Sequence, residues 1–130
     1  GATQIALARF LRRHAETIPG REQLAVEAFA DALEVIPRVL AENAGLDPLD
    51  TLLRVVAEQS TSTSKDAHCI GLDVIARGPA NMKEKGVVEP LRITRQVLAG
   101  ATEAALSVLR IDDVLWAKQD PTIPDGLDED

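Results

Sequence analysis

Aromatic residues are almost missing from this sequence of 130 residues: they make up 2% of it, and there is no tyrosine. Hydrophobic residues still account for 45% of the chain, so a core has to be built from Ala, Leu, Val and Ile. Small aliphatic side chains let helix axes approach closely and lose little entropy on burial. The length and composition therefore favour one closely packed helical domain.

Basic residues, cysteines and long apolar runs are also scarce. The formal net charge of −7 argues against a nucleic-acid binder and against adhesion to an anionic membrane, because both need a basic face. The single cysteine, Cys69, excludes an intramolecular disulfide. No apolar run approaches the roughly 18 residues of a membrane helix, and no signal-peptide pattern opens the chain. We expect a cytoplasmic protein whose partners are neither nucleic acid nor membrane.

Apolar residues recur at helical spacing over most of the chain, and Gly and Pro mark the boundaries. The pattern predicts a helix from Thr3 to Ile18, with Ile5, Ala8, Leu11, Ala15 and Ile18 on its apolar face. A second helix is predicted from Arg21 to Val35, with a broad apolar face of Leu24, Ala25, Ala28, Phe29, Ala32, Val35 and Ile36. A face this broad suggests burial on two sides.

Pro37 interrupts this second pattern, so we expect a kink or a restart before the chain turns at Gly45. Asp47 and Pro48 suit the start of a third helix, as a side-chain cap and a first-turn residue. Its predicted core face is Leu49, Leu52, Leu53, Val56 and Ala57. A long helix is predicted from Leu91 to Arg110.

The segments around these helices carry weaker signals. Residues 59–66 are rich in Ser and Thr and predict a flexible loop, and residues 69–75 predict a strand or an extended turn. Residues 79–85 resemble a short helix, and residues 111–117 a possible edge strand. The predicted fold class is all-α (mainly helical), with one or two short edge strands. Residues 1–117 form the expected domain, and residues 118–130 an acidic flexible tail.

The residues on their own predict no complete active site. There is no phosphate-binding Gly-rich loop followed by Lys-Ser/Thr, no His-Glu-x-x-His and no Cys-x-x-Cys. His14 lies among charges, as a surface residue would. His68 beside Cys69 suggests a metal or a nucleophile pair, but adjacent side chains in extended backbone point to opposite faces. Asp112-Asp113 is better explained as a capping or solvated pair than as a cation site. We therefore predict neither a catalytic residue nor a metal ligand.

A family resemblance takes the interpretation further. Residues 20–52 read GREQLAVEAFADALEVIPRVLAENAGLDPLDTL, and they are followed by GLDV at 71–74, GVVEPLRI at 86–93 and ATEAALSVLRIDDV at 101–114. Together these segments resemble the C-terminal half of the equatorial ATP-binding domain of group II chaperonins, that is, the thermosome and its eukaryotic cytosolic relatives. The resemblance implies a mostly helical part of a double-ring ATPase that encloses unfolded proteins and helps them fold.

The implied function is a share in this ATP-dependent folding ring: ring contacts, and the adenine and ribose side of the ATP pocket. The implied partners are other chaperonin subunits, with unfolded clients held by other domains. ATP with Mg²⁺ is the implied cofactor of the complete subunit. The family's Gly-Asp-Gly-Thr-Thr phosphate loop and catalytic aspartates do not occur in this sequence. We therefore expect this chain alone neither to hydrolyse ATP nor to bind it tightly. The alternative is a stand-alone helical interaction module, derived from a chaperonin and without nucleotide chemistry.

The resemblance implies three cofactor-binding positions. Gly1 matches the end of a Gly-rich turn that passes close to the nucleotide, or it is simply the first residue of the chain. Asp73 matches the segment that flanks the adenine, or it is a turn aspartate bonded to its own backbone. Glu89 matches an acidic residue that accepts hydrogen bonds from the ribose, or it is an ordinary exposed glutamate. Thr94 departs from the family, since many relatives have a basic residue there.

Overall fold

The computed structural model describes residues 1–111, in two units that are treated separately, 1–88 and the part of 89–130 up to residue 111. Most of the predicted edge strand at 111–117, the Asp112-Asp113 pair and the acidic tail at 118–130 lie outside the described residues. The described chain is mainly helical with one small sheet, as predicted. Its elements are α1 (Ala2–Ala15), α2 (Glu22–Asn43), α3 (Pro48–Thr61), η1 (Ala67–Cys69), β1 (Ile70–Asp73), β2 (Gly78–Asn81) and α4 (Leu91–Leu109). None of these helices is long and apolar enough to cross a membrane.

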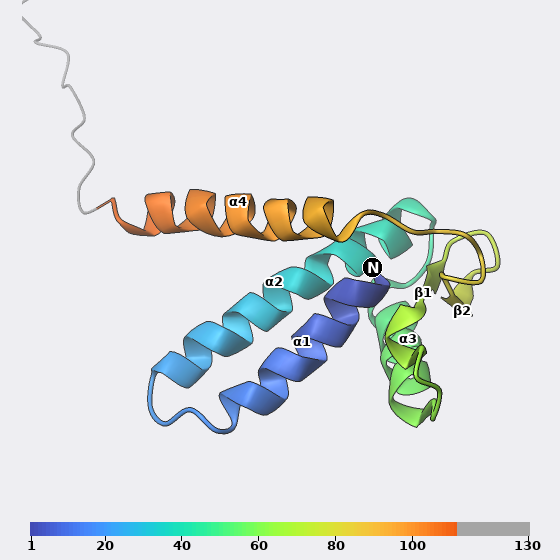
Figure 1. The fold of residues 1–130 in the computed structure, drawn as a ribbon, viewed down its shortest axis with the longest axis horizontal. Helices are drawn as coiled ribbons and strands as arrows, with labels where there is room; N and C mark the ends of the chain where they lie inside the picture. Colours follow the sequence, from blue (N-terminus) through green and yellow to red (C-terminus); the bar gives the residue numbers. More distant parts are fainter. Residues whose placement is uncertain (112–130) are drawn as a thin grey trace, which may run out of the picture. The chain divides into compact units, whose positions relative to one another are not determined.

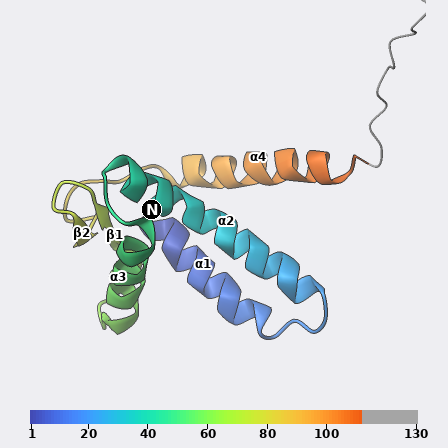
Figure 2. The ribbon, with the colours of Figure 1, turned by 180° about the vertical axis from the view of Figure 1, so that it is seen from behind.

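Helices α1 and α2 lie side by side as an antiparallel hairpin (Figures 1 and 2). Gly20 sits in the connecting turn with a positive φ of 81°, a conformation that costs glycine little. Ile5, Ala8 and Ala15 of α1 are fully buried and Leu11 is half-buried, in agreement with most of the predicted apolar stripe, but the helix ends at Ala15, before Ile18. The start of α1 lies at the other end of the hairpin, beside α3 and β1 (Figure 1).

Helix α2 corrects two predictions. It runs without interruption from Glu22 to Asn43, so of the two outcomes expected at Pro37, a kink or a restart, the restart is wrong. Pro37 is buried inside the helix, and this packing compensates for the backbone hydrogen bond that a proline cannot donate. The side that packs inward, here called the inner face, consists of Ala30, Leu33, Glu34, Pro37 and Ala41.

The predicted apolar face of α2 is exposed. We call it the outer face; it consists of Leu24, Ala25, Ala28, Phe29, Ala32, Val35 and Ile36. The inner face is narrower and less hydrophobic, but it is the one that meets α1 and the core. Small residues allow the close approach of two helices, and that geometry, rather than hydrophobicity, decides which side is buried here.

Helix α3 begins as predicted and ends later than predicted. Asp47 caps it by accepting a hydrogen bond from Asp50 N at 2.7 Å, and Pro48 occupies the first turn. The helix continues to Thr61, so the loop predicted from Gln59 is wrong for its first three residues. Its buried face is Thr51, Leu52, Val55 and Gln59. Of the predicted core face only Leu52 is buried, whereas Leu49 and Leu53 are exposed.

A β-hairpin follows α3. Strand β1 lies in the segment predicted to be extended, and it pairs antiparallel with β2 in the register Ile70↔Asn81 to Asp73↔Gly78. The short helix predicted at residues 79–85 is therefore wrong: its first three residues belong to β2. Pairing with β1 outweighs the weak helical preference of so short a segment, and Pro79 is tolerated because this two-stranded sheet has only edge strands.

The hydrophobic core lies where α1, α2, α3 and β1 meet. It is built from Ile5, Ala41, Leu52, Val55, Ile70 and Leu72, with Leu46 and Val56 packed against it. The core thus packs the start of α1 against α3 and strand β1 of the β-hairpin. In the second unit, α4 spans Leu91–Leu109, in agreement with the predicted long helix.

Candidate functional site

Gly1 occupies the N-cap position of α1, and its carbonyl accepts a hydrogen bond from Ile5 N at 3.1 Å. A Cβ added at Gly1 would lie 2.9 Å from Cβ of Pro37, closer than two carbon atoms normally come. A close backbone approach was the reason for predicting a need for glycine here. The approach predicted was to the nucleotide, whereas the one in the structure is to Pro37 on the inner face of α2, so the nucleotide contact stays a prediction.

The first residues of α1 also press on β1. A Cβ at Gly71 would come within 3.0 Å of Ala2 Cβ and 2.9 Å of Met82 Cγ. Glycine at both positions lets the start of α1 sit directly against the strand that leads to Asp73. Gly1 and Asp73, two of the three predicted cofactor-binding positions, therefore belong to packed, neighbouring elements of one unit.

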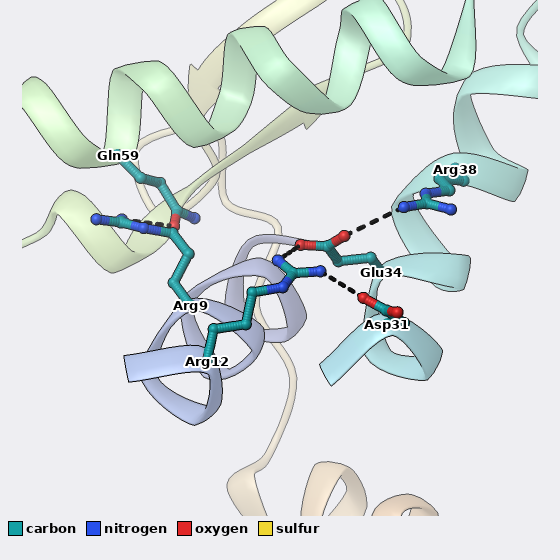
Figure 3. A network of polar contacts seen from close by, with 6 residues as sticks. All are labelled: Arg9, Arg12, Asp31, Glu34, Arg38 and Gln59. Atoms are coloured by element: carbon teal, nitrogen blue, oxygen red, sulfur yellow. Dashed lines mark hydrogen bonds and ion pairs between the residues drawn. The ribbon is translucent and has the colours of Figure 1, made fainter. Parts of the chain in front are cut away.

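Gln59 of α3 links the first turn of α1 to the start of β1. The sequence predicts a loop at this residue. Its side chain is 4% exposed, and its Nε2 donates to Ala2 O at 3.1 Å and to Ile70 O at 2.7 Å. Its Oε1 accepts from Nη1 of Arg9 at 3.4 Å (Figure 3). Buried polar groups need such partners, and one amide here serves α1, α3 and β1 at once. The sequence does contain a signal for its burial: Gln59 follows Leu52 and Val55 at helical spacing, and so lies on the same face of α3.

Asp73 is 9% exposed at the end of β1. Its Oδ1 accepts from the backbone N of Ile75 at 2.9 Å and of Ala76 at 3.0 Å, and its Oδ2 pairs with Nζ of Lys85 at 2.8 Å. The hydrogen bond from Lys85 and those from the backbone lower the pKa of Asp73 from 3.8 to about 2. The side chain has the contacts of a turn aspartate, and its cationic partner, Lys85, was not predicted.

Glu89, the third predicted position, belongs to the second unit and is exposed directly before α4. Its Oε1 accepts a hydrogen bond from Oγ1 of Thr94 at 2.6 Å. In the sequence, Thr94 stands out only because many relatives have a basic residue at this position. In the structure it holds the Glu89 carboxylate at the start of the helix.

A polar network lies between α1 and α2 (Figure 3). Arg12 of α1 pairs with Asp31 at 2.7 Å and with Glu34, and Arg38 pairs with Glu34 at 3.3 Å. The hydrogen bonds to Glu34 and Asp31 raise the pKa of Arg12. Because Glu34 is only 3% exposed, these two arginines supply the charge that its buried carboxylate needs. The network fixes the helical hairpin whose open end carries Gly1.

The two cavities described for residues 1–111 are not lined by the predicted residues. A cavity of about 240 Å³ lies elsewhere in the first unit, lined by the polar residues Glu58, Ser62, Ser64, Asp66, Asn81 and Glu84 together with Ile70, Pro79 and Ala80. None of Gly1, Asp73 and Glu89 lines it. The first unit thus contains Gly1 and Asp73, on the neighbouring elements α1 and β1, and the second unit contains the carboxylate of Glu89.

Comparison with known proteins identifies the family. The model of the TCP-1/cpn60 chaperonin family matches residues 1–119. A thermosome subunit of Methanocaldococcus jannaschii is 54% identical over 119 residues, which are 92% of this chain and 21% of that protein. The thermosome subunit alpha of Thermoplasma acidophilum is 48% identical over 126 residues, 97% of this chain and 22% of that protein.

A solved structure agrees with the sequence matches. The open-state monomer of a group II chaperonin from Methanococcoides burtonii superimposes with a TM-score of 0.78 at 43% identity, over 85% of this chain and 27% of that chain. The chain therefore spans about a fifth of the length of the curated relatives it matches. The predicted resemblance is confirmed: this chain belongs to the TCP-1/cpn60 chaperonin family, and its fold matches part of a group II chaperonin equatorial domain.

Proposed function

We propose that this chain serves an ATP-dependent protein-folding chaperonin ring, in which it contributes ring contacts and the adenine and ribose side of the ATP pocket. The family match over residues 1–119 carries this proposal. The proposal includes a cytoplasmic location, a domain over residues 1–117 with an acidic tail at 118–130, and other chaperonin subunits as partners. Phosphate and Mg²⁺ binding, hydrolysis and client binding fall to parts of a complete subunit that this sequence does not contain.

The contacts of Asp73 support a specific division of work in the ATP pocket. Its carboxylate is already bonded to the backbone of Ile75 and Ala76 and to Lys85. In the proposal Asp73 is therefore a positioning residue: it holds the turn after β1 in the shape that flanks the adenine. Gly1 fits the same role at the start of α1, where a larger residue would collide with Pro37.

Glu89 is the residue proposed to bind the nucleotide directly. A carboxylate that accepts hydrogen bonds from two ribose hydroxyls contributes about 1.5–3 kcal/mol for each bond to the charged group. The hydrogen bond from Thr94 restricts the side chain before binding, which reduces the entropy that binding would otherwise cost. Thr94 thereby orients the carboxylate without the basic residue that many relatives have.

The exposed outer face of α2 supports the ring part of the proposal. Contiguous apolar surface of this kind usually marks an interaction site, and the chain corresponds to about a fifth of its relatives' length. In the proposal, other parts of the chaperonin cover this face. The same surface would also suit the alternative, an independent interaction module, and the assembly state separates the two.

Two measurements test the proposal. The native mass of the particle that carries this sequence, measured by light scattering after gentle purification with ATP, should be that of a large ring. Affinity for a fluorescent ATP analogue should fall about tenfold or more in the Glu89→Gln variant of that particle, from the loss of charged hydrogen bonds. The exposed Glu103→Gln is the matched control. A particle no larger than a few such chains would support the interaction module, and unchanged affinity of Glu89→Gln would remove the ribose role.

A further inference from the structure

The segment between α3 and β1 brings together three side chains that can ligate a metal. The expectation of no site at His68 and Cys69 rests on an extended backbone, which would put the two side chains on opposite faces. That assumption is wrong: Ala67–Cys69 form the 3-10 helix η1, with Cys69 N donating to Asp66 O at 2.8 Å. The tight turn places one ligand atom each of Asp66, His68 and Cys69 within 4.8 Å of one another.

From this cluster we propose that Asp66, His68 and Cys69 form a binding site for a divalent cation of the zinc type. The site shares no residue with the proposed nucleotide pocket and does not depend on it. A thiolate, an imidazole and a carboxylate are the donors that Zn²⁺ takes in proteins, whereas Mg²⁺ and Ca²⁺ select oxygen ligands. Three protein ligands leave the fourth tetrahedral position to water or to a group of a bound molecule.

The geometry requires only a small adjustment. Ligand atoms about 2.0–2.3 Å from a tetrahedral zinc ion lie about 3.5 Å apart. Closing from 4.8 Å to that spacing takes a shift of about 1 Å, which rotation of exposed or partly exposed side chains provides. The backbone is already held: Met82 N donates to Cys69 O at 2.9 Å, and Asp66 N donates to Ser64 Oγ at 3.2 Å.

Lys83 is the competitor for this site. Its Nζ lies 3.1 Å from both carboxylate oxygens of Asp66. The lysine side chain is 59% exposed, so this ion pair is weak and can open when a metal ion arrives. Asp66 also lines the 240 Å³ cavity, which gives a cation access from solvent.

A titration with Co²⁺ tests the proposal, because a cobalt–thiolate bond gives a charge-transfer absorption that zinc does not show. We expect one Co²⁺ per chain with this band, and displacement of cobalt by Zn²⁺. Cys69→Ser should abolish the band, and Asp66→Asn and His68→Gln should each weaken binding about tenfold or more. Lys83→Met should strengthen binding about thirtyfold, the factor expected for removing a unit positive charge about 4 Å from a divalent ion in water.

Controls make the result decisive. His14→Gln removes the only other histidine of the sequence and should leave binding unchanged. Circular dichroism checks that the weakened variants remain folded, and the gain in Lys83→Met cannot arise from misfolding. Absence of the charge-transfer band, an equal loss in His14→Gln, or weaker binding in Lys83→Met would each overturn the proposal.

Discussion

On α2 the more hydrophobic face is exposed and the less hydrophobic face is buried. The inner face is buried although it contains Glu34 and small residues, whereas the outer face is exposed although it contains Leu24, Phe29 and Val35. Burial of the inner face depends on fit: Pro37 meets Gly1, and Glu34 meets two arginines. An apolar stripe therefore need not be the face that is buried within the chain. Small and charged residues can mark the face that packs against the chain's own elements.

The largest expected effect comes from substituting one leucine on each face. Leu33 is 5% exposed and Leu24 is 65% exposed on the same helix. Leu33→Ala should lower the free energy of unfolding by about 2–5 kcal/mol, because it removes buried methyl groups and leaves a cavity. Leu24→Ala should change it by less than about 0.5 kcal/mol. Urea unfolding of both variants measures the difference, and equal losses would remove the distinction between the faces.

A second substitution tests the charged part of the inner face. Arg12→Ala leaves the buried Glu34 carboxylate paired with Arg38 but without the arginine of α1, and should cost about 1–3 kcal/mol of unfolding free energy. Arg13→Ala, at the neighbouring exposed position, should fall within about 0.5 kcal/mol of the parent. Thermal or urea unfolding gives both values. A loss in Arg13→Ala as large as that in Arg12→Ala would show that the network contributes nothing specific.

A third test uses pH to separate Asp73, a nearly buried carboxylate, from exposed ones. The folded-state pKa of about 2 lies below the ordinary value of 3.8, so the ionised form stabilises the fold above about pH 4. This contribution is lost as the pH falls from 3.8 towards 2. The urea midpoint of Asp73→Asn should therefore lie below that of the parent at neutral pH, and the two should converge between about pH 4 and pH 2.

Lys85→Met should behave in the same way, because it removes the main cause of the lowered pKa. A gap between the parent and Asp73→Asn that stays constant down to about pH 2 would contradict the assignment of this carboxylate.

The smallest effect on stability is expected on the outer face. Val35, 50% exposed, can be replaced by the similarly shaped threonine, and Val35→Thr should change the unfolding free energy by less than about 0.5 kcal/mol. If the outer face is covered in a chaperonin ring, the same change should reduce ring yield in light scattering. Normal assembly would show that this part of the outer face is not an interface.

Much of the helical fold follows from the sequence because strong local signals agree with the packing. The spacing of Ile5, Ala8 and Ala15 predicts α1, and Asp47 predicts the start of α3. The errors occur where distant partners decide. Residues 79–81 form a strand because β1 lies beside them, and which face of α2 is buried depends on the position of α1.

The candidate site shows the same limit. The turn-aspartate alternative for Asp73 follows from residue type, and the structure contains those hydrogen bonds. Its ion pair with Lys85 depends on the register of a hairpin, and the hydrogen bond from Thr94 depends on the rotamer of Glu89. Gln59 was missed because a glutamine near Ser and Thr resembles a loop residue until its helical phase is counted from Leu52 and Val55.

The single amide of Gln59 has a consequence for how the fold opens. Since its two donated hydrogen bonds end on Ala2 and Ile70, the last turn of α3 cannot fray without freeing the first turn of α1 and the start of β1. These three segments should therefore open together, as one cooperative unit in native-state hydrogen exchange. Their slowly exchanging amides would share one opening free energy, even though they lie far apart along the chain.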